Sequence, residues 1–221
     1  MLYGIISDIH GNLEALNVVL DSLGQAQRII CLGDIVGYGP DPDACIEKIK
    51  ELNIATVAGN HDKAVTGELP TDGFNQNARG AVLWTKEVIS AKNLDYLKRL
   101  PLVLEEDDFQ MVHGSLVNPL EEYITNSGNA YPTFQMMTRQ LLFVGHTHQP
   151  LRLSFKSKEI INPGGVGQPR DGDPRASYGE YDSKTRVFTL HRVAYNIEKV
   201  QAKMRTAKLP LPLIDRLSFG R

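Results

Sequence analysis

The sequence predicts an α/β fold built around a parallel β-sheet, and three observations support this prediction. Short apolar runs alternate with amphipathic stretches through the first third of the chain. Their spacing fits strand–helix–strand units, which place neighbouring strands parallel to one another. Small polar clusters directly follow several of the apolar runs, at the points where the strands are expected to end.

The first third of the chain is expected to form three strands and two helices. In the first helix, leucine and valine recur at spacings of three and four residues, which is typical of one buried helical face. Asp41 or Asp43 is placed to cap the second helix. The expected strands are residues 2–7, 28–32 and 54–57, and the expected helices are about 12–23 and 41–52.

The middle of the chain is expected to be helical from about residue 75 to residue 100, where Pro101 ends the helix. Residues 118–138 have weak periodicity and several Gly, Pro and Asn residues, so we expect an excursion from the sheet there. The other predicted strands are residues 102–104, 109–112, 141–144, 151–155, 159–161, 176–181 and 187–190.

A last helix is expected at about 196–207, followed by an apolar tail that contains Pro210 and Pro212. Such a tail is too apolar to stay in water. We expect it to pack on the body of the chain or on a second subunit, which would make the protein a homodimer. Without a linker or an internal repeat, residues 1–221 are predicted to form one domain, with about 195–221 packed on it.

Composition limits the classes of function. The chain has 221 residues and a net charge of −2, so no overall basic field attracts nucleic acid, and no specific nucleic-acid partner is expected. The late basic residues between Lys199 and Lys208 fit a solvated helix face. No apolar run reaches membrane-spanning length, and no signal peptide precedes the first strand, so we expect a cytoplasmic protein without a membrane partner. Cys31 lies in an apolar run and is expected to be a core residue.

Histidines concentrate at the ends of the predicted strands. Five of the six lie in four short clusters, and a fifth cluster, Gly33-Asp34, has none. In open α/β sheets the ligand crevice lies outside the carboxyl ends of the strands, so clusters far apart in sequence are expected to meet. The histidine clusters are Asp8-Ile9-His10, Gly59-Asn60-His61-Asp62, His113-Gly114 and Gly145-His146-Thr147-His148.

The donor types in these clusters favour a metal site. They offer imidazoles, carboxylates and one amide oxygen without a thiolate, which suits manganese, iron or zinc. Taken singly, each cluster also has a purely structural interpretation. An Asp followed by a helix, such as Asp8, is often a helix cap, and Gly-Asn and Gly-His pairs are common in turns. It is their joint occurrence at successive strand ends that indicates a site. His191 has no such companion and is expected to be structural.

Five short motifs, taken in their order along the chain, resemble the signature of the calcineurin-like metallophosphoesterase superfamily. They are D-x-H, G-D-x-x-G-Y-G, G-N-H-D, H-G and G-H-T-H. The chain is most similar to the small bacterial and archaeal members that consist of little more than the catalytic domain. The resemblance runs from Asp8 to His148, and the later N-P-G-G-V-G-Q-P-R-D-G-D-P segment fits the same subgroup. It implies a four-layer α-β-β-α sandwich with two mixed sheets and a metal site at the carboxyl ends of the strands.

The resemblance also implies a role for each site residue. Asp8, His10 and His148 would hold one metal, and Asn60, His113 and His146 would hold the other. Asp34 would bridge the two. Two adjacent cations, with manganese, iron or zinc as the candidates, can activate a bridging water as the nucleophile that attacks a phosphate ester. His61 would contact the phosphate and protonate the leaving oxygen, while Asp62 either orients His61 or caps the next helix.

Substrate contacts are expected from Asn60, His61 and Arg170. Arg170 and Arg175 lie in the late glycine-rich loop, where the alternative is an exposed turn arginine. Gly164–Gly167 is not followed by a helix, so it supports neither a P-loop nor a Rossmann fingerprint. Ser115 is not in a nucleophile elbow. Tyr38 is expected to shape the loop behind Asp34.

The sequence predicts a phosphodiesterase or phosphatase and leaves two alternatives open. One is a dinucleoside polyphosphate hydrolase. The other is a non-catalytic scaffold, since a retromer subunit has this fold without activity; scaffolds of that kind typically lack part of the ligand set, which is complete here. Specificity is expected from loops 66–77 and 118–138. Within the second loop, aromatic residues can either stack on a base or pack the loop down; these are Tyr123, Tyr131 and Phe134.

Overall fold

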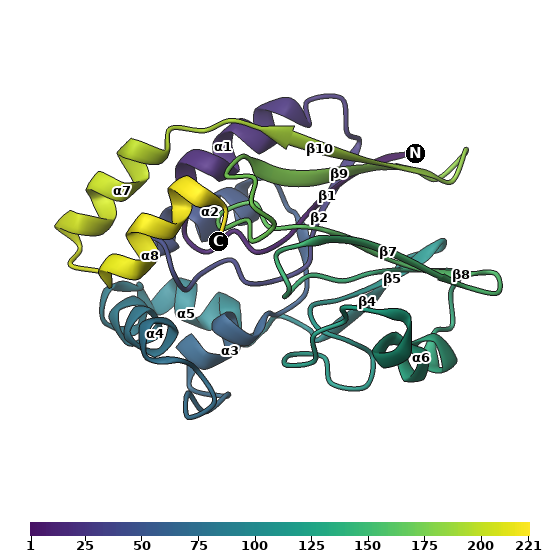
Figure 1. The fold of residues 1–221 in the computed structure, drawn as a ribbon, viewed down its shortest axis with the longest axis horizontal. Coiled ribbons are helices and arrows are strands. Elements are labelled where there is room, and N and C mark those ends of the chain that lie inside the picture. Colours follow the sequence, from purple (N-terminus) through teal and green to yellow (C-terminus); the bar gives the residue numbers. More distant parts are fainter.

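The computed structural model describes residues 1–221 and contains two five-stranded sheets that face each other (Figure 1). The first sheet has the order β10-β9-β1-β2-β3, and the second has the order β4-β5-β6-β8-β7. The strands of the first sheet are β1 (Leu2–Ile6), β2 (Arg28–Cys31), β3 (Ala55–Thr56), β9 (Ala176–Asp182) and β10 (Val187–Val193). Those of the second are β4 (Val103–Glu105), β5 (Phe109–Val112), β6 (Leu141–Phe143), β7 (Pro150–Phe155) and β8 (Lys158–Pro163).

Both sheets are mixed. In the first, β1, β2 and β3 are parallel and form the predicted strand–helix–strand core, whereas β9 and β10 are antiparallel additions. In the second, β5, β6 and β8 are parallel, with β4 and β7 antiparallel at the two edges. The carboxyl ends of all six parallel strands are therefore available for a common site.

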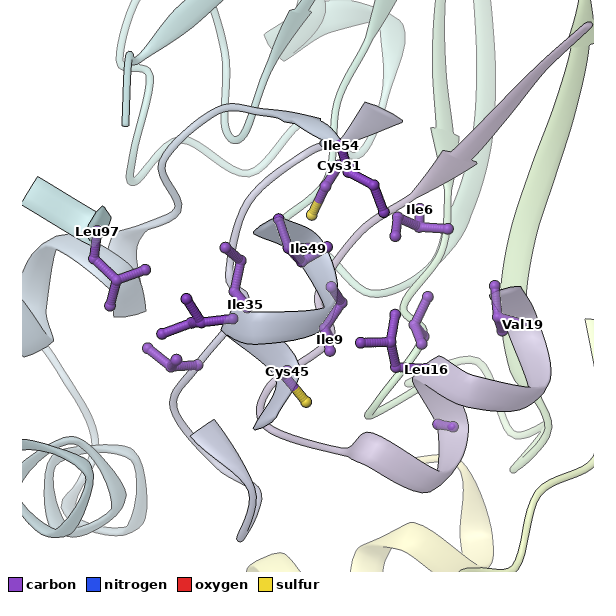
Figure 2. Close-up of a cluster of buried hydrophobic side chains, with 14 of the residues drawn as sticks. Ile6, Ile9, Leu16, Val19, Cys31, Ile35, Cys45, Ile49, Ile54 and Leu97 are labelled. Atoms are coloured by element: carbon purple, nitrogen blue, oxygen red, sulfur yellow. The ribbon is translucent and has the colours of Figure 1, made fainter. Parts of the chain in front are cut away.

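Alternation along the strands builds the layers. Ile5 of β1 and Phe143 of β6 point into the core between the sheets, while their neighbours Ile6 and Leu142 belong to the two outer faces. The first outer face packs on α1 (Leu13–Ser22) and α2 (Pro42–Glu51), and Figure 2 shows this cluster. The second packs on α6 (Ser127–Met136). The expected four-layer α-β-β-α sandwich is confirmed.

The prediction of one long helix over residues 75–100 is wrong, because the structure has two helices there, α4 (Gln76–Val88) and α5 (Ala91–Lys98). The backbone leaves the helical region at Ile89, and the Ser90 N–H and hydroxyl both donate to Asp43 of α2. This long-range contact fixes the break. It also occupies Asp43, and Asp41 makes no capping bond either, so neither carboxylate caps α2.

The 118–138 excursion contains α6, which Asn126 caps by accepting from the N–H groups of Gly128 and Asn129. A short helix, α3 (Asn60–Thr66), begins within the second histidine-bearing motif, Gly59-Asn60-His61-Asp62. Helix α7 (Ile197–Thr206) follows β10, and the tail folds into α8 (Leu211–Arg216) and the 3₁₀ helix η1 (Leu217–Phe219).

The tail is partly buried within the chain. Leu213, Ile214 and Leu217 pack with α4 and with Tyr38, and Gln201 of α7 donates to the Ile214 carbonyl at 2.9 Å. Leu211 stays 66% exposed. A homodimer that covers such exposed residues stays a prediction. No helix in the structure is long and apolar enough to cross a membrane.

Candidate metal centre

The predicted clusters meet at the carboxyl ends of β1, β2, β3, β5 and β6. The structure brings all seven candidate ligands together and buries every one of them. Their exposed fractions are 0% for Asp8, 1% for His10, 1% for Asp34, 8% for Asn60, 0% for His113, 4% for His146 and 2% for His148. So many buried polar groups need compensation from one another or from a bound cation.

The donors form two groups that share one carboxylate. Asp8, His10, Asp34 and His148 make up the first group, whose donor atoms lie within 4.8 Å of one another. In it, His148 Nε2 lies 3.4 Å from Asp8 Oδ1 and 3.1 Å from His10 Nε2. Asp34, His113 and His146 make up the second group.

Asn60 joins the second group through its amide oxygen. Its Oδ1 lies 3.1 Å from His113 Nε2, which in turn lies 3.2 Å from His146 Nδ1. Asp34 stands between the groups, with Oδ2 at 3.5 Å from His10 Nε2 and 3.4 Å from His113 Nε2. Its other oxygen accepts from the His61 N–H at 2.9 Å.

Three imidazoles are oriented by backbone carbonyls. In each, Nδ1 donates to a carbonyl and Nε2 points into the site. His10 and His148 keep the lone pair on Nε2, whereas Asp34, against the effect of burial, raises the pKa of His113 to about 9, so a cation would replace the proton there. The acceptors are Val36 for His10 at 3.0 Å, Leu32 for His113 at 2.8 Å and Gln168 for His148 at 2.6 Å. Two bare nitrogens that face each other, as in His10 and His148, repel unless a cation lies between them.

The backbone of the site is strained. Five of the nine non-glycine residues with positive φ are candidate ligands, and a left-handed conformation is uncommon for such residues. These are Asp8 (54°), His10 (50°), Asp34 (54°), His146 (67°) and His148 (57°). The surrounding structure therefore holds the ligand loops in conformations that they would not adopt alone.

Close packing makes one glycine of the G-N-H-D motif necessary. A Cβ atom on Gly59 would lie 2.0 Å from Asp34 Oδ1, so any larger residue would displace the shared carboxylate. Asp62 stabilises this turn, because its carboxylate accepts from the N–H groups of Gly59 at 3.0 Å and Val36 at 3.2 Å. Of its two predicted roles, the structure supports helix capping over orientation of His61.

The electrostatics fit cation binding. Burial raises the pKa of Asp8 and lowers the pKa of His10 and His148 well below its usual value, so these imidazoles are neutral, as ligands must be. Burial acts to raise the pKa of Asp34, but the neighbouring His113 imidazole outweighs this and holds that pKa below its usual range. Asp8 Oδ1 and His146 Nε2 are buried without any hydrogen-bond partner. The donor set therefore fits a metal.

His61 is buried beside the donor set without joining it, and its ring centroid lies 4.9 Å from that of His10 in the first group. Its ring contacts the rings of Tyr38 and Phe74, with centroids 4.4 Å and 4.9 Å away. Burial lowers the pKa of His61 to about 4. Its Nδ1 has no hydrogen-bond partner and faces Gly37, where an added Cβ would approach to 2.6 Å. Tyr38 therefore contacts the site directly, in addition to shaping the loop behind Asp34.

The two loop arginines behave differently. Arg170 lies over the Tyr38 ring, 5.6 Å from its centroid, and donates to the Gln168 side chain at 2.9 Å without any ion pair. Arg175 instead pairs with Asp173 at 2.7 Å and stays exposed. His191 pairs with Glu180 at 3.1 Å and stacks on Tyr178, as expected of a structural residue.

The aromatic residues of the second loop also separate. Phe134 is core and Tyr131 packs against Phe155, whereas the Tyr123 ring lies on His146 with centroids 3.9 Å apart. From the sequence alone, Tyr123 could not be distinguished from Tyr131 and Phe134 as a residue that stacks on a base. A cavity of about 220 Å³ opens here beside His61. It is lined by Tyr38, Asn60, His61, Gly73, Phe74, Asn75, Ala78, Glu121, Tyr123 and His146.

This fold and this set of buried donors define a metal-dependent phosphoesterase, a hydrolase that acts on ester bonds. The family model of the calcineurin-like phosphoesterase superfamily domain matches residues 1–186, and the chain belongs to that superfamily.

Three similar proteins span nearly the whole chain. A metallophosphoesterase structure from Sphaerobacter thermophilus is 44% identical, with a TM-score of 0.91 and coverage of 100% of this chain and 99% of that one. The uncharacterized protein MJ0912 of Methanocaldococcus jannaschii is 41% identical over 100% of this chain and 98% of its own length. The phosphodiesterase YfcE of Escherichia coli K12 is 27% identical over 90% of this chain and 94% of its own.

Proposed function

We propose that this protein hydrolyses phosphate esters, with phosphodiesters as the main candidate class, by means of two metal ions. One observation carries the proposal: two buried donor groups share the single carboxylate of Asp34, which lies about equally far from an imidazole of each. The same oxygen, Oδ2, faces both groups while Oδ1 accepts from the His61 N–H, so this one carboxylate oxygen is placed where it would bridge two cations. The phosphodiesterase YfcE supports the choice of diesters.

In this proposal each residue keeps the role that the family resemblance implies. Asp8, His10 and His148 would hold the first cation, and Asp34 would bridge it to the second. Asn60, His113 and His146 would complete the second site. When bound, two such cations supply an activated water and neutralise charge on the phosphate. The nitrogen and oxygen donors favour manganese or iron, with zinc as a further candidate.

His61 is proposed as the general acid. It borders both the donor set and the cavity, so an ester bound there would place its leaving oxygen near the imidazole. Because burial lowers the pKa of His61, its proton has to be stabilised by the negative charge of the bound ester. Asn60 and His61 thereby also serve as substrate contacts.

Arg170 is proposed to contact the phosphate. Its guanidinium has no carboxylate partner, and its backbone is tied to the site because the Arg170 N–H donates to the His148 carbonyl at 3.2 Å. An arginine held in this way keeps donors free for phosphate oxygens.

The test combines metal content with turnover. Purified protein, treated with a chelator and then supplied with manganese, should bind two ions per chain and hydrolyse bis(p-nitrophenyl) phosphate. Calcium should restore much less activity, since it prefers six to eight oxygen ligands at longer distances. Equal turnover without metal, or a single ion per chain at saturation, would contradict the proposal.

A further inference from the structure

The cavity beside His61 is formed where the two expected specificity loops face each other. Gly73, Phe74 and Asn75 come from the connection between α3 and α4, and Glu121 and Tyr123 come from the connection between β5 and α6. The catalytic side of the cavity is closed by candidate site residues. A group bound here is therefore attached to the reacting phosphate on the side of His61.

The walls of this cavity are flat aromatic rings. One face of Tyr123 covers His146, and the side chain is still 49% exposed, although it is large and apolar. Phe74 meets His61 at an interplanar angle of 75°, edge to face. Aromatic rings held beside a cavity by the site residues themselves are suited to contact another planar group.

Charge and hydrogen-bonding capacity at the rim narrow the class of that group. The Glu121 carboxylate forms no ion pair, so it would repel a second phosphate and accept from an N–H or O–H donor. Asn75 uses its amide oxygen to cap α4, accepting from the Ala78 N–H at 3.0 Å, which leaves its NH₂ group free to donate. A neutral planar ring with donors and acceptors on its edge satisfies both side chains.

We propose that this cavity is a slot for the nucleobase of a nucleoside carried on the leaving side of the ester. The inference rests on the proposed phosphoesterase function and names its substrate class. The base contacts Tyr123 and Phe74, its edge reaches Glu121 and Asn75, and the nucleoside oxygen departs beside His61.

A matched set of substrates isolates the base. The methyl ester of adenosine 5′-phosphate and the methyl ester of 1-O-methylribose 5-phosphate have the same reacting centre and differ in the base. With the manganese-loaded protein, kcat/KM should favour the adenosine ester by about tenfold or more, as expected for one stacked base. Methyl 2-naphthylmethyl phosphate carries a planar group without hydrogen-bonding edges. Its kcat/KM should exceed that of the ribose ester by a smaller factor than the kcat/KM of the adenosine ester does.

Variants assign the preference to the slot. Tyr123→Ala and Phe74→Ala should lose at least about tenfold more kcat/KM on the adenosine ester than on the ribose ester. Tyr131→Ala is the matched control, because Tyr131 is an equally exposed tyrosine of the same segment that packs on Phe155 instead. It should keep the wild-type preference. Circular dichroism and melting temperature verify that each variant is folded.

Equal kcat/KM of the wild type on the two methyl diesters would overturn the proposal. The proposal would also be overturned if Tyr123→Ala lowered kcat/KM by the same factor on the adenosine and ribose esters. If the naphthyl diester had as high a kcat/KM as the adenosine ester, the assignment to a nucleobase would be overturned. If no diester is hydrolysed, the proposed function fails instead. In that case, calorimetry still tests the slot, because adenosine 5′-phosphate must bind the wild type at least about tenfold more tightly than ribose 5-phosphate, and Tyr123→Ala must remove the difference.

Discussion

The two halves of the donor set differ in how firmly the protein holds them. In the first half, Asp8, His10 and His148 are at most 2% exposed, and both imidazoles donate through Nδ1 to backbone carbonyls. In the second half only His113 is anchored in this way. His146 has an aromatic ring packed on it, its Nε2 has no partner, and Asn60 is 8% exposed toward the cavity.

The difference divides the site into two sides. We call Asp8, His10 and His148 the fixed side, and Asn60, His113 and His146 the working side. Ligands oriented by hydrogen bonds from a second layer bind metal more tightly than ligands that must be ordered on binding. We therefore expect the first half to hold its cation more tightly. The second half lines the cavity through Asn60 and His146, so substrate is expected to arrive and leave there.

The largest effect should come from breaking the link between the halves. Asp34→Asn keeps the shape of the side chain and removes its charge, so both proposed cations would lose a ligand at once. Metal content should fall for both halves, and turnover of bis(p-nitrophenyl) phosphate should fall further than in any variant of one half. A purified variant with two bound ions and near wild-type turnover would show that Asp34 does not bridge.

Removing one histidine from each half tests the difference directly. His148→Ala should abolish the tighter class of manganese binding, whereas His146→Ala should abolish the weaker class and keep one tightly held ion. Manganese titration followed by electron paramagnetic resonance separates the two classes. Identical titrations of the two variants would mean that the orienting hydrogen bonds do not distinguish the halves.

The sequence predicted the parts of this site that depend on strand ends. Parallel strands bring their carboxyl ends to one edge, so the order of the polar clusters was enough to place Asp8, Asp34 and His113 together. The left-handed backbone at the ligands was not predictable from local pattern, because it is imposed by contacts such as that between Gly59 and the Asp34 carboxylate.

Errors in the predicted fold arose where tertiary contacts override periodicity. The apolar pattern continues through residues 75–100, yet Asp43 from another helix ends α4 by binding Ser90. In the 118–138 segment, Pro132 inside α6 and its asparagine cap weakened the helical signal. The position of Tyr123 on His146 depends on how two loops fold against each other, which no local spacing encodes.

Substitution of His61, which lines the same cavity as Asn60 and His146, tests the role of the working side. Proton donation matters most for a poor leaving group, and a positioned acid contributes about 10²–10⁴-fold. His61→Ala should bind both metals, lose activity in that range on an alkyl diester, and lose distinctly less on a nitrophenyl ester, whose leaving group departs without a proton. A uniform loss across leaving groups would indicate that His61 grips the phosphate instead.

The smallest effect should come from loosening the fixed side without removing a ligand. The Ser7 hydroxyl, fully buried, donates to Asp8 Oδ2 at 2.6 Å and so orients the carboxylate toward the first half. Ser7→Ala removes this hydrogen bond, and loss of such an orienting partner typically weakens metal affinity by about 10–100-fold. Only the tighter class of manganese binding should weaken, since no atom of Ser7 bonds to the second half. Ser22→Ala is the control, because Ser22 donates to the Val18 carbonyl on the exposed side of α1 and should leave both classes unchanged. Equal weakening of both classes in Ser7→Ala would show that the two halves respond as one unit and that the fixed side is not separately organised.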